Sequence, residues 1–379
     1  MTSLQKRIES IMTGKIDPPF SLNLVLTFLS KAYGAGARLR RNGYASGFLK
    51  SKKLPCAVIS IGNLTTGGTG KTPMVIYLAE RVRRMGYRVA VISRGYKGAA
   101  EKRGGIVSDG SRIQMTPDTA GDEPFLLAAS LKGIPVLVGH DRYRSGRLAV
   151  NRFQTEVVIL DDAFQHLALF RDLNLLLLDA TLPFGNGHLL PRGTLREPAS
   201  AMRFSDALIM TRSPQPFCRP DALWARTRPL FCAIHEPFVS ARFSAGEKLT
   251  FQSPAFFTGH VFSMEKRYFA FSGIAQNDDF LKTLKKMGAD VCGFQGFSDH
   301  HFYSDQDIRL ILNAAALAGA TALATTEKDL ARLHGRFHFP MECVVIGIRM
   351  SLDPAMAFDI FIRNRISLTH DQRRCHHLE

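Results

Sequence analysis

A glycine-rich stretch around residue 70 combines the residue types that bind a nucleoside triphosphate. It reads GNLTTGGTGKT from Gly62 to Thr72 and lies between an apolar run and a helix-like segment. Glycines let backbone N–H groups turn toward phosphate oxygens, and the N-terminus of a helix adds a favourable dipole. Lys71 can reach the β- and γ-phosphates, and the Thr72 hydroxyl can ligate Mg²⁺. The stretch therefore predicts a binding loop for ATP and Mg²⁺.

This loop departs from the common P-loop pattern at one position. The pattern G-x-x-x-x-G-K-[ST] begins with a glycine, and Thr65 stands there in this chain. The GGTGKT run in a strand-to-helix setting still favours a nucleotide over the alternative, a glycine-rich turn that binds none. We expect the nucleotide contacts to come from eight consecutive residues: Thr65, Thr66, Gly67, Gly68, Thr69, Gly70, Lys71 and Thr72.

Two carboxylates at the end of a predicted strand are candidate ligands for the magnesium ion. The apolar run VVIL at residues 157–160 leads directly into Asp161 and Asp162. Carboxylates at the end of such a strand can hold the hydrated Mg²⁺ that bridges nucleotide phosphates. The alternative is an acidic strand end that is merely solvated, and the nearby phosphate loop favours the metal.

Alternating strands and helices must position these groups. Short apolar runs predict strands at residues 56–61, 89–92, 136–138, 157–160, 175–178 and 207–210, and a helix over 73–85 follows the phosphate loop. Continuous apolar strands separated by helical lengths indicate a parallel sheet covered on both faces. Ligands in such sheets bind beyond the carboxyl ends of the strands.

A second α/β pattern follows a proline-containing stretch at 214–231, which we interpret as a linker. Its predicted strands are residues 268–271, 321–325 and 344–346, and its predicted helices are residues 278–287 and 305–318. These patterns predict an N-terminal segment at 1–50, a P-loop domain at 51–215, a smaller α/β domain at 225–365 and a loose tail at 366–379.

The charge balance favours an anionic partner. The chain has 49 basic and 33 acidic residues, a formal net charge of +16, which attracts nucleic acid, an anionic bilayer or a phosphorylated substrate. The basic residues form no single tract or known nucleic-acid module, so we expect no nucleic-acid partner. Six widely spaced cysteines without a CxxC pair, and the lack of a convincing signal peptide, favour the reducing cytosolic side.

One early segment has the character of a membrane-surface helix. Residues 18–30 carry no charge and are rich in Phe and Leu, but a spanning helix needs about 20 apolar residues. The basic residues that follow are Lys31, Arg38, Arg40, Arg41, Lys50, Lys52 and Lys53. An apolar helix beside a basic cluster suits an anionic leaflet. The alternative is a helix packed on the protein's own core. The predicted fold is thus α/β, with a P-loop NTPase-like parallel sheet domain, a smaller α/β domain and an N-terminal membrane-associated helix.

Several phrases along the chain resemble one enzyme family. Residues 61–73, around the phosphate loop, closely resemble the tetraacyldisaccharide 4'-kinases, the lipid A kinases of Gram-negative bacteria. Further phrases agree in order: SRGY at 93–96, GDEP at 121–124, LDDAFQH at 160–166, LPRG at 190–193, LREP at 195–198, FSDHH at 297–301 and TTEKD at 325–329. The resemblance runs from about residue 20 to 350, and Thr65 is normal within it.

The resemblance implies the reaction and its setting. It implies transfer of the γ-phosphate of ATP to the 4'-hydroxyl of a tetraacyldisaccharide 1-phosphate, the lipid A precursor. It also implies association of the N-terminal helix with the cytoplasmic face of the inner membrane. A sugar hydroxyl is a poor nucleophile, so a carboxylate that accepts its proton assists the transfer.

The resemblance also implies roles for individual residues. It gives the proton-accepting part to Asp122 of GDEP and an orienting part to His300 of FSDHH. Without it, we would interpret Asp122 as a helix N-cap and His300 as a satisfied surface or core histidine. Since His300 falls in the predicted second domain, catalysis then requires the two domains to close over the substrate.

The remaining motif residues suggest weaker roles. Arg94, Arg192 and Arg196 can clamp phosphate or the substrate's 1-phosphate bidentately, although arginines commonly form surface ion pairs instead. Glu197 is a candidate to assist Mg²⁺. Gln165 and His166 are candidate liners of the active site, and residues 326–328 suit a helix cap better than a nucleotide contact.

Two other classes of protein share parts of this pattern. Nucleotide-dependent switch or assembly ATPases also carry loops that read GG-x-GKT, and they activate water rather than an acceptor hydroxyl. A nucleic-acid-dependent P-loop enzyme fits the positive charge. Stimulation by DNA or RNA that falls steeply with salt identifies that class.

Overall fold

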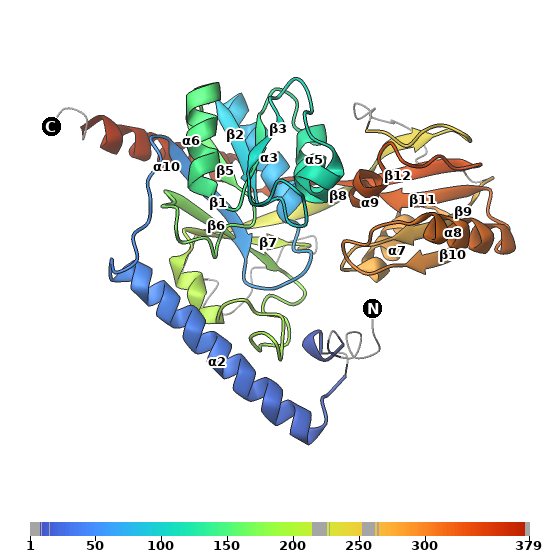
Figure 1. Cartoon of the computed structure of the whole chain (residues 1–379), viewed down its shortest axis with the longest axis horizontal. Coiled ribbons are helices and arrows are strands. Elements are labelled where there is room, and N and C mark those ends of the chain that lie inside the picture. The colour runs from blue at the N-terminus through green and yellow to red at the C-terminus, as the bar shows by residue number, and fades with distance from the viewer. Residues whose placement is uncertain are drawn as a thin grey trace. The chain divides into compact units, whose positions relative to one another are not determined.

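The computed structural model describes residues 8, 10–14, 16–213, 226, 228–251, 262–263 and 265–375 (Figure 1). The chain forms two compact units, and neither is continuous in sequence. Unit 1 comprises Met1–Arg94, Asp141–His235 and Met350–Glu379. Unit 2 comprises Gly95–His140 and Glu236–Arg349.

Unit 1 is built on a parallel sheet, which confirms the predicted α/β class. Its strands are β1 (Ala57–Asn63), β2 (Val89–Ser93), β5 (Val157–Leu160), β6 (Leu173–Asp179) and β7 (Ala207–Thr211). They lie in the order β7-β6-β1-β5-β2, and the first residues of β8 (Leu230–Phe243) pair with β7. Nearly every residue of these strands is buried, as expected for a parallel sheet with both faces covered.

Helices pack on this sheet through apolar faces. Helix α3 (Lys71–Arg84) buries Met74, Val75, Leu78 and Val82, and it begins two residues before the predicted start. Helix α6 (Arg142–Phe153) is capped by the side chain of Asp141. Helix α10 (Ala355–Cys375) contacts α3 and β1. The prediction of a loose tail from residue 366 is therefore wrong as far as residue 375, because α10 continues through it; residues 376–379 lie outside the described residues.

Helix α2 (Phe20–Ala45) joins the apolar segment and the start of the basic cluster into one element. It buries Leu26, Ser30, Gly34 and Arg41, which helical spacing places on one side. Ser30 Oγ donates a hydrogen bond to the carbonyl of Leu189 at 2.9 Å. Within the described parts of the chain, no helix combines the length and apolar character needed to cross a bilayer.

Unit 2 contains a set of parallel strands and an antiparallel pair of strands. The parallel strands lie in the order β10-β9-β11-β12 and comprise β10 (Asp290–Gly296), β9 (Arg267–Ser272), β11 (Ala322–Thr326) and β12 (Glu342–Asp353). The antiparallel pair is β3 (Gly105–Ser108) with β4 (Val136–Val138), and residues 109–135 connect the two strands. Its helices are α4 (Pro117–Ala120), α5 (Asp122–Ser130), α7 (Asn277–Lys286), α8 (Asp305–Leu317) and α9 (Glu327–Leu333).

The division into units differs from the predicted continuous domains 51–215 and 225–365. The chain leaves unit 1 after β2, forms residues 95–140 of unit 2, and returns before α6. It passes between the units again within β8 and within β12, so residues 350–365 belong to unit 1. Most of the predicted linker, residues 214–225, lies outside the described residues, and Leu230 and Phe231 begin β8.

Candidate active site

The phosphate loop lies between the end of β1 at Asn63 and the start of α3 at Lys71. Gly70 is the N-cap residue of α3 and has a φ of 80°, a left-handed conformation that favours glycine. Asn63 Nδ2 donates a hydrogen bond to Thr69 Oγ1 at 2.9 Å. A Cβ added at Gly67 or Gly68 would meet no atom within 4 Å, so the tip of the loop borders open space. The loop thus presents backbone N–H groups and a helix N-terminus to an anion.

Lys71 and Asp162 lie together beside this loop. Lys71 Nζ is 3.7 Å from Asp162 Oδ1, and Arg196 Nη1 donates to both carboxylate oxygens of Asp162 at 2.9 Å. Burial of Asp162 acts to raise its pKa, but the positive charges of Lys71 and Arg196 outweigh burial and lower it. Asp162 is therefore held as a carboxylate. Its neighbour Asp161 is buried and accepts a hydrogen bond from Ser93 Oγ at 2.9 Å.

These residues fit a magnesium ion that is carried by a nucleotide. In the described ranges, no group of three or more His, Cys, Asp or Glu side chains is arranged to hold a metal ion. Mg²⁺ is usually held by one or two protein carboxylates together with phosphates and water. Asp161, Asp162 and the hydroxyl of Thr72, the second residue of α3, supply a donor set of that kind.

Glu197 has a different partner from the other predicted metal ligands. Its Oε2 lies 2.5 Å from Arg41 Nη2 of α2. The Arg41 guanidinium is also 5.2 Å from the ring centroid of Phe164 and 4.5 Å from that of Phe204. Burial raises the pKa of Glu197, and the charge of Arg41 opposes that rise. The structure therefore pairs Glu197 with an arginine that anchors α2, while the adjacent Arg196 pairs with Asp162.

The other predicted liners of the site are spread over unit 1. Arg94 follows β2 directly and is exposed, and Arg192 is partly buried. Gln165 Nε2 donates to the carbonyl of Asn63 at 2.9 Å, which ties the segment after β5 to the start of the phosphate loop. Arg171, which sequence reasoning missed, fixes the same segment: its Nη1 donates to the carbonyls of residues 163, 164 and 166.

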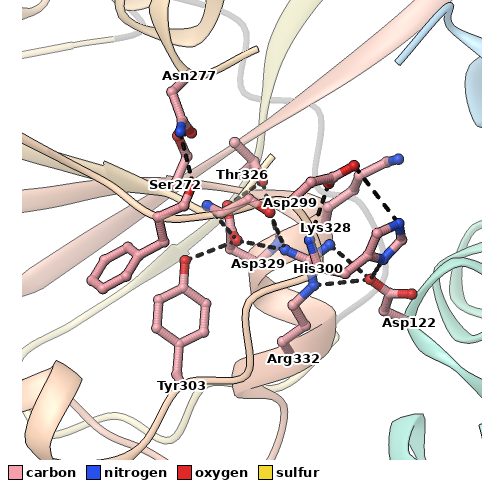
Figure 2. A network of polar contacts seen from close by, with 12 residues as sticks. Asp122, Ser272, Asn277, Asp299, His300, Tyr303, Thr326, Lys328, Asp329 and Arg332 are labelled. Atoms are coloured by element: carbon pink, nitrogen blue, oxygen red, sulfur yellow. Dashed lines mark hydrogen bonds and ion pairs between the residues drawn. The ribbon is translucent and has the colours of Figure 1, made fainter. Parts of the chain in front are cut away.

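Unit 2 brings Asp122 and His300 into direct contact (Figure 2). Asp122 Oδ2 is 2.8 Å from His300 Nδ1. Asp122 is the first residue of α5, and the N-cap position belongs to Gly121, so the N-cap interpretation of Asp122 is wrong. The predicted domain boundary is corrected here too. Both residues belong to unit 2, and their pairing therefore needs no closure between units.

Arg332 is the second partner of Asp122. Its Nε and Nη2 donate to Asp122 Oδ2 at 2.9 and 2.7 Å. Burial acts to raise the pKa of Asp122, but the hydrogen bond from His300 and the charge of Arg332 hold that pKa well below its usual range. The hydrogen bond to Asp122 in turn raises the pKa of His300. Asp122 is thus an ionised carboxylate that His300 and Arg332 both contact through hydrogen bonds.

The TTEKD phrase forms both a helix cap and a contact to the GDEP phrase. Thr326 Oγ1 accepts a hydrogen bond from the backbone N–H of Asp329, so the predicted cap of α9 is confirmed. Lys328 Nζ lies 2.7 Å from Glu123 Oε1, which links α9 to α5. Sequence reasoning missed this ion pair, although both residues stand in motif phrases. It also missed Arg332, which stands outside every phrase and carries no local signal.

Comparison with known proteins gives a consistent result. A family model described as Tetraacyldisaccharide-1-P 4'-kinase matches residues 22–367. The tetraacyldisaccharide 4'-kinase of Desulfatibacillum aliphaticivorans is 42% identical over 374 residues, which cover 97% of this chain and all of the relative. The enzyme of the same name from Syntrophus aciditrophicus is 41% identical over 354 residues, which cover 90% of this chain and 92% of the relative.

A solved structure agrees with these matches. LpxK from Aquifex aeolicus, crystallised in complex with ATP, superposes with a TM-score of 0.72 and is 34% identical. The match covers 91% of this chain and 99% of that chain. The family match contains the phosphate loop, the acidic pair at 161–162 and the Asp122–His300 contact. From these matches and this geometry, the chain belongs to the tetraacyldisaccharide-1-P 4'-kinase family.

Proposed function

We propose that this protein transfers the γ-phosphate of ATP to the 4'-hydroxyl of a tetraacyldisaccharide 1-phosphate, a step of lipid A biosynthesis. The observation that carries the proposal is the family match over residues 22–367, which includes both the phosphate loop and Asp122. The alternative of a nucleotide-dependent switch or assembly ATPase is not favoured by that match.

The phosphate loop and its neighbours bind the donor. ATP supplies the phosphoryl group, and Mg²⁺ offsets part of its negative charge. Backbone N–H groups within residues 65–72 surround the phosphates, except that of Thr66, which donates to the carbonyl of Thr194. Lys71 donates to the terminal phosphate oxygens. The hydroxyl of Thr72 and the carboxylates of Asp161 and Asp162 would hold the ion.

Asp122 acts as the base toward the acceptor. Its carboxylate is ionised at neutral pH, since its pKa lies well below the usual range. It accepts the proton of the 4'-hydroxyl while that oxygen attacks the γ-phosphorus. His300 holds the carboxylate through the 2.8 Å contact and stabilises the charge.

Arginines of unit 1 recognise the anionic part of the acceptor. Arg94 and Arg192 are the candidates for the 1-phosphate, because Arg196 is committed to Asp162 in this structure. Guanidinium groups suit this task because they bind phosphate oxygens bidentately. We propose that Glu197 contributes indirectly, by anchoring α2 through Arg41.

Helix α2 places the enzyme on an anionic membrane surface, where its lipid substrate resides. Phe20, Leu24, Phe28 and Leu39 are between 57% and 80% exposed, and helical spacing puts Leu24, Phe28 and Leu39 on the side of α2 away from its buried residues. Lys31 and Arg38 are exposed on the same helix. Apolar and basic residues together favour insertion at the cytoplasmic face of the inner membrane, rather than binding to nucleic acid.

Two variants test the proposed chemistry. Lys71→Ala is expected to abolish phosphorylation of the tetraacyldisaccharide 1-phosphate, since the terminal phosphate loses its cation. Asp122→Asn is expected to lower kcat by about 10²–10⁴-fold with the Kd for ATP retained. Steady-state kinetics with the lipid acceptor and ATP-binding calorimetry measure both quantities. An unchanged kcat for Asp122→Asn removes Asp122 from the role of base.

A further inference from the structure

Arg332 is the most firmly held cation among the contacts of Asp122. Its side chain is only 6% exposed. Besides its two bonds to Asp122, its Nη1 donates to the carbonyl of Gly273 at 2.5 Å and to Asp329 Oδ1 at 3.1 Å. The four bonds fix the guanidinium plane, because the donors of arginine form a rigid fork.

Asp329 anchors this guanidinium from the protein interior. Its side chain is fully buried. Its Oδ1 also accepts bonds from the Gly273 backbone N–H at 3.0 Å and the Tyr303 hydroxyl at 2.9 Å. Its Oδ2 accepts from Thr326 Oγ1 at 2.6 Å. Figure 2 shows the resulting chain of contacts, which runs from Tyr303 and Thr326 through Asp329 and Arg332 to Asp122 and His300.

The two carboxylate oxygens of Asp122 differ in the number of hydrogen-bond donors that contact them. Oδ2 faces three donor nitrogens, one of His300 and two of Arg332. Oδ1 accepts only the backbone N–H of the next residue, Glu123, at 2.9 Å among the contacts that are described. A carboxylate oxygen offers about two lone-pair sites, so Oδ2 is filled and Oδ1 retains room for a donor.

We propose that Arg332 is a positioning residue for phosphoryl transfer, which holds Asp122 so that Oδ1 receives the proton of the acceptor hydroxyl, and that Asp329 holds Arg332. This inference rests on the proposed function. In the step, the hydroxyl oxygen forms the new bond to phosphorus and its proton passes to Asp122 Oδ1. The bond between the γ-phosphorus and the β–γ bridging oxygen breaks, and its electron pair leaves with ADP.

The charges around Asp122 support this role. His300 contacts Asp122 from the loop after β10 and Arg332 from α9, while Lys328 of α9 interacts with its charge. The carboxylates of Asp299, Asp329 and Glu123 lie beside these cations. Tyr303, bonded to Asp329, completes the set. Arg332 is the cation that donates two hydrogen bonds to Asp122, so removing it is expected to raise the pKa of Asp122. As the pH is lowered, a variant without Arg332 is then expected to lose activity at a higher pH than the wild type does.

The pH dependence of kcat tests the proposal with Arg332→Met and Arg332→Lys in the full-length protein. We expect Arg332→Met to lower kcat at neutral pH about 10- to 100-fold and to move the acidic limb of the profile to higher pH by about one unit or more. Arg332→Lys keeps the charge but loses the fork, so its acidic limb is expected to lie closer to the wild type. An acidic limb of Arg332→Met that overlaps the wild type overturns the proposal, whatever the size of kcat.

A milder variant keeps the test open if Arg332→Met does not fold. Tyr303→Phe removes the hydroxyl that bonds to Asp329 and retains the ring, which packs against Phe271 at 5.8 Å. We expect a shift of the acidic limb in the same direction but smaller, and no shift contradicts the role of Asp329. The variant Asp122→Asn distinguishes a wrong assignment of the base from a wrong assignment of the positioning residue. If it retains the full rate, the proposed base is wrong; if it is inactive while all Arg332 and Tyr303 variants match the wild type, only the positioning role is wrong.

Discussion

At the scale of single residues, the proposed acid–base chemistry depends on a contact between two residues of unit 2. Asp122 and His300 are 178 positions apart in sequence and 2.8 Å apart in the structure. A left-handed φ of 56° at His300 and the glycine before Asp122, with a φ of 91°, turn the two chain segments toward each other. The proposed base is therefore positioned by unit 2 alone, while the phosphate loop belongs to unit 1.

Coupling between these two residues is expected to appear in kinetics. If His300 acts only through Asp122, the loss of kcat in the double variant Asp122→Asn/His300→Ala should be close to that of Asp122→Asn alone. A double-mutant cycle on kcat with the lipid acceptor measures this. Losses that multiply across the cycle show that the two residues act independently.

The same pair predicts a pH-dependent contribution to stability. Folding raises the pKa of His300 above its ordinary value of about 6.5, so its stabilisation is fully present below that value and is lost as pH rises through the folded pKa. The His300→Gln substitution should therefore reduce the free energy of unfolding more at pH 5.5 than at pH 9, by about 1–2 kcal/mol at the lower pH. Urea unfolding at both pH values measures the difference.

A histidine elsewhere in unit 2 provides the control for that experiment. His338 is exposed, and His338→Gln should change stability little and equally at both pH values. A loss for His300→Gln that is equal at both pH values, or larger at pH 9, contradicts the pairing with Asp122.

Motif residues could be found from sequence, but their partners could not. The glycine-rich loop, the acidic pair and the GDEP phrase all carry local signals of residue type and spacing. Arg332 carries none, since an arginine on an amphipathic helix is usually a surface group. Only the tertiary structure shows that it is buried against Asp122. The pairing of Glu197 with Arg41 was likewise invisible, because 156 positions separate them.

At the scale of elements, the sequence alone allowed two alternative interpretations of α2. The alternatives were a helix packed on the protein and a helix at a membrane surface. The structure shows the first, through Leu26, Ser30, Gly34 and Arg41, and leaves the opposite apolar side exposed. The membrane role is thus a proposal about that exposed side alone.

Vesicle binding tests this proposal with a matched pair of variants. Leu24→Gln/Leu39→Gln removes two exposed leucines of α2 and should weaken binding to phosphatidylethanolamine–phosphatidylglycerol vesicles more than about tenfold. The control, Leu310→Gln/Leu317→Gln, removes two exposed leucines of α8 and should leave binding unchanged. Equal binding by both variants and the wild type in cosedimentation refutes the role of α2.

Sequence periodicity predicted the central strands well and the peripheral ones poorly. The strand at 157–160 was located to the residue, because a buried parallel strand forms a continuous apolar run. The strand at 136–138 was also located to the residue, since its three residues are apolar and fully buried although its partner β3 runs antiparallel. Strand β10 was missed, since its residues are only partly buried and include two glycines. Strand β8 was missed over its whole length, and the prolines that precede it indicated a linker that extended to its first residues.

At the scale of the whole molecule, each unit is built from more than one segment of the chain. Residues 95–140 leave unit 1 to supply Asp122 to unit 2, and α10 returns to unit 1 at the end of the described chain. Periodicity gives elements in chain order and carries no information on which sheet each one joins, so the predicted domains were continuous. Fold class and family were nevertheless accessible, since both depend on local patterns.

The most direct test of the central claim is the identity of the product. Purified protein is incubated with Mg-ATP and tetraacyldisaccharide 1-phosphate, and the lipid is analysed by mass spectrometry and by ³¹P–¹H NMR. A lipid one phosphate heavier, with the new ester on the 4' carbon and none formed by Lys71→Ala, is the expected result. ATP hydrolysis that leaves the disaccharide unmodified, or a phosphate at another position, contradicts the proposed reaction.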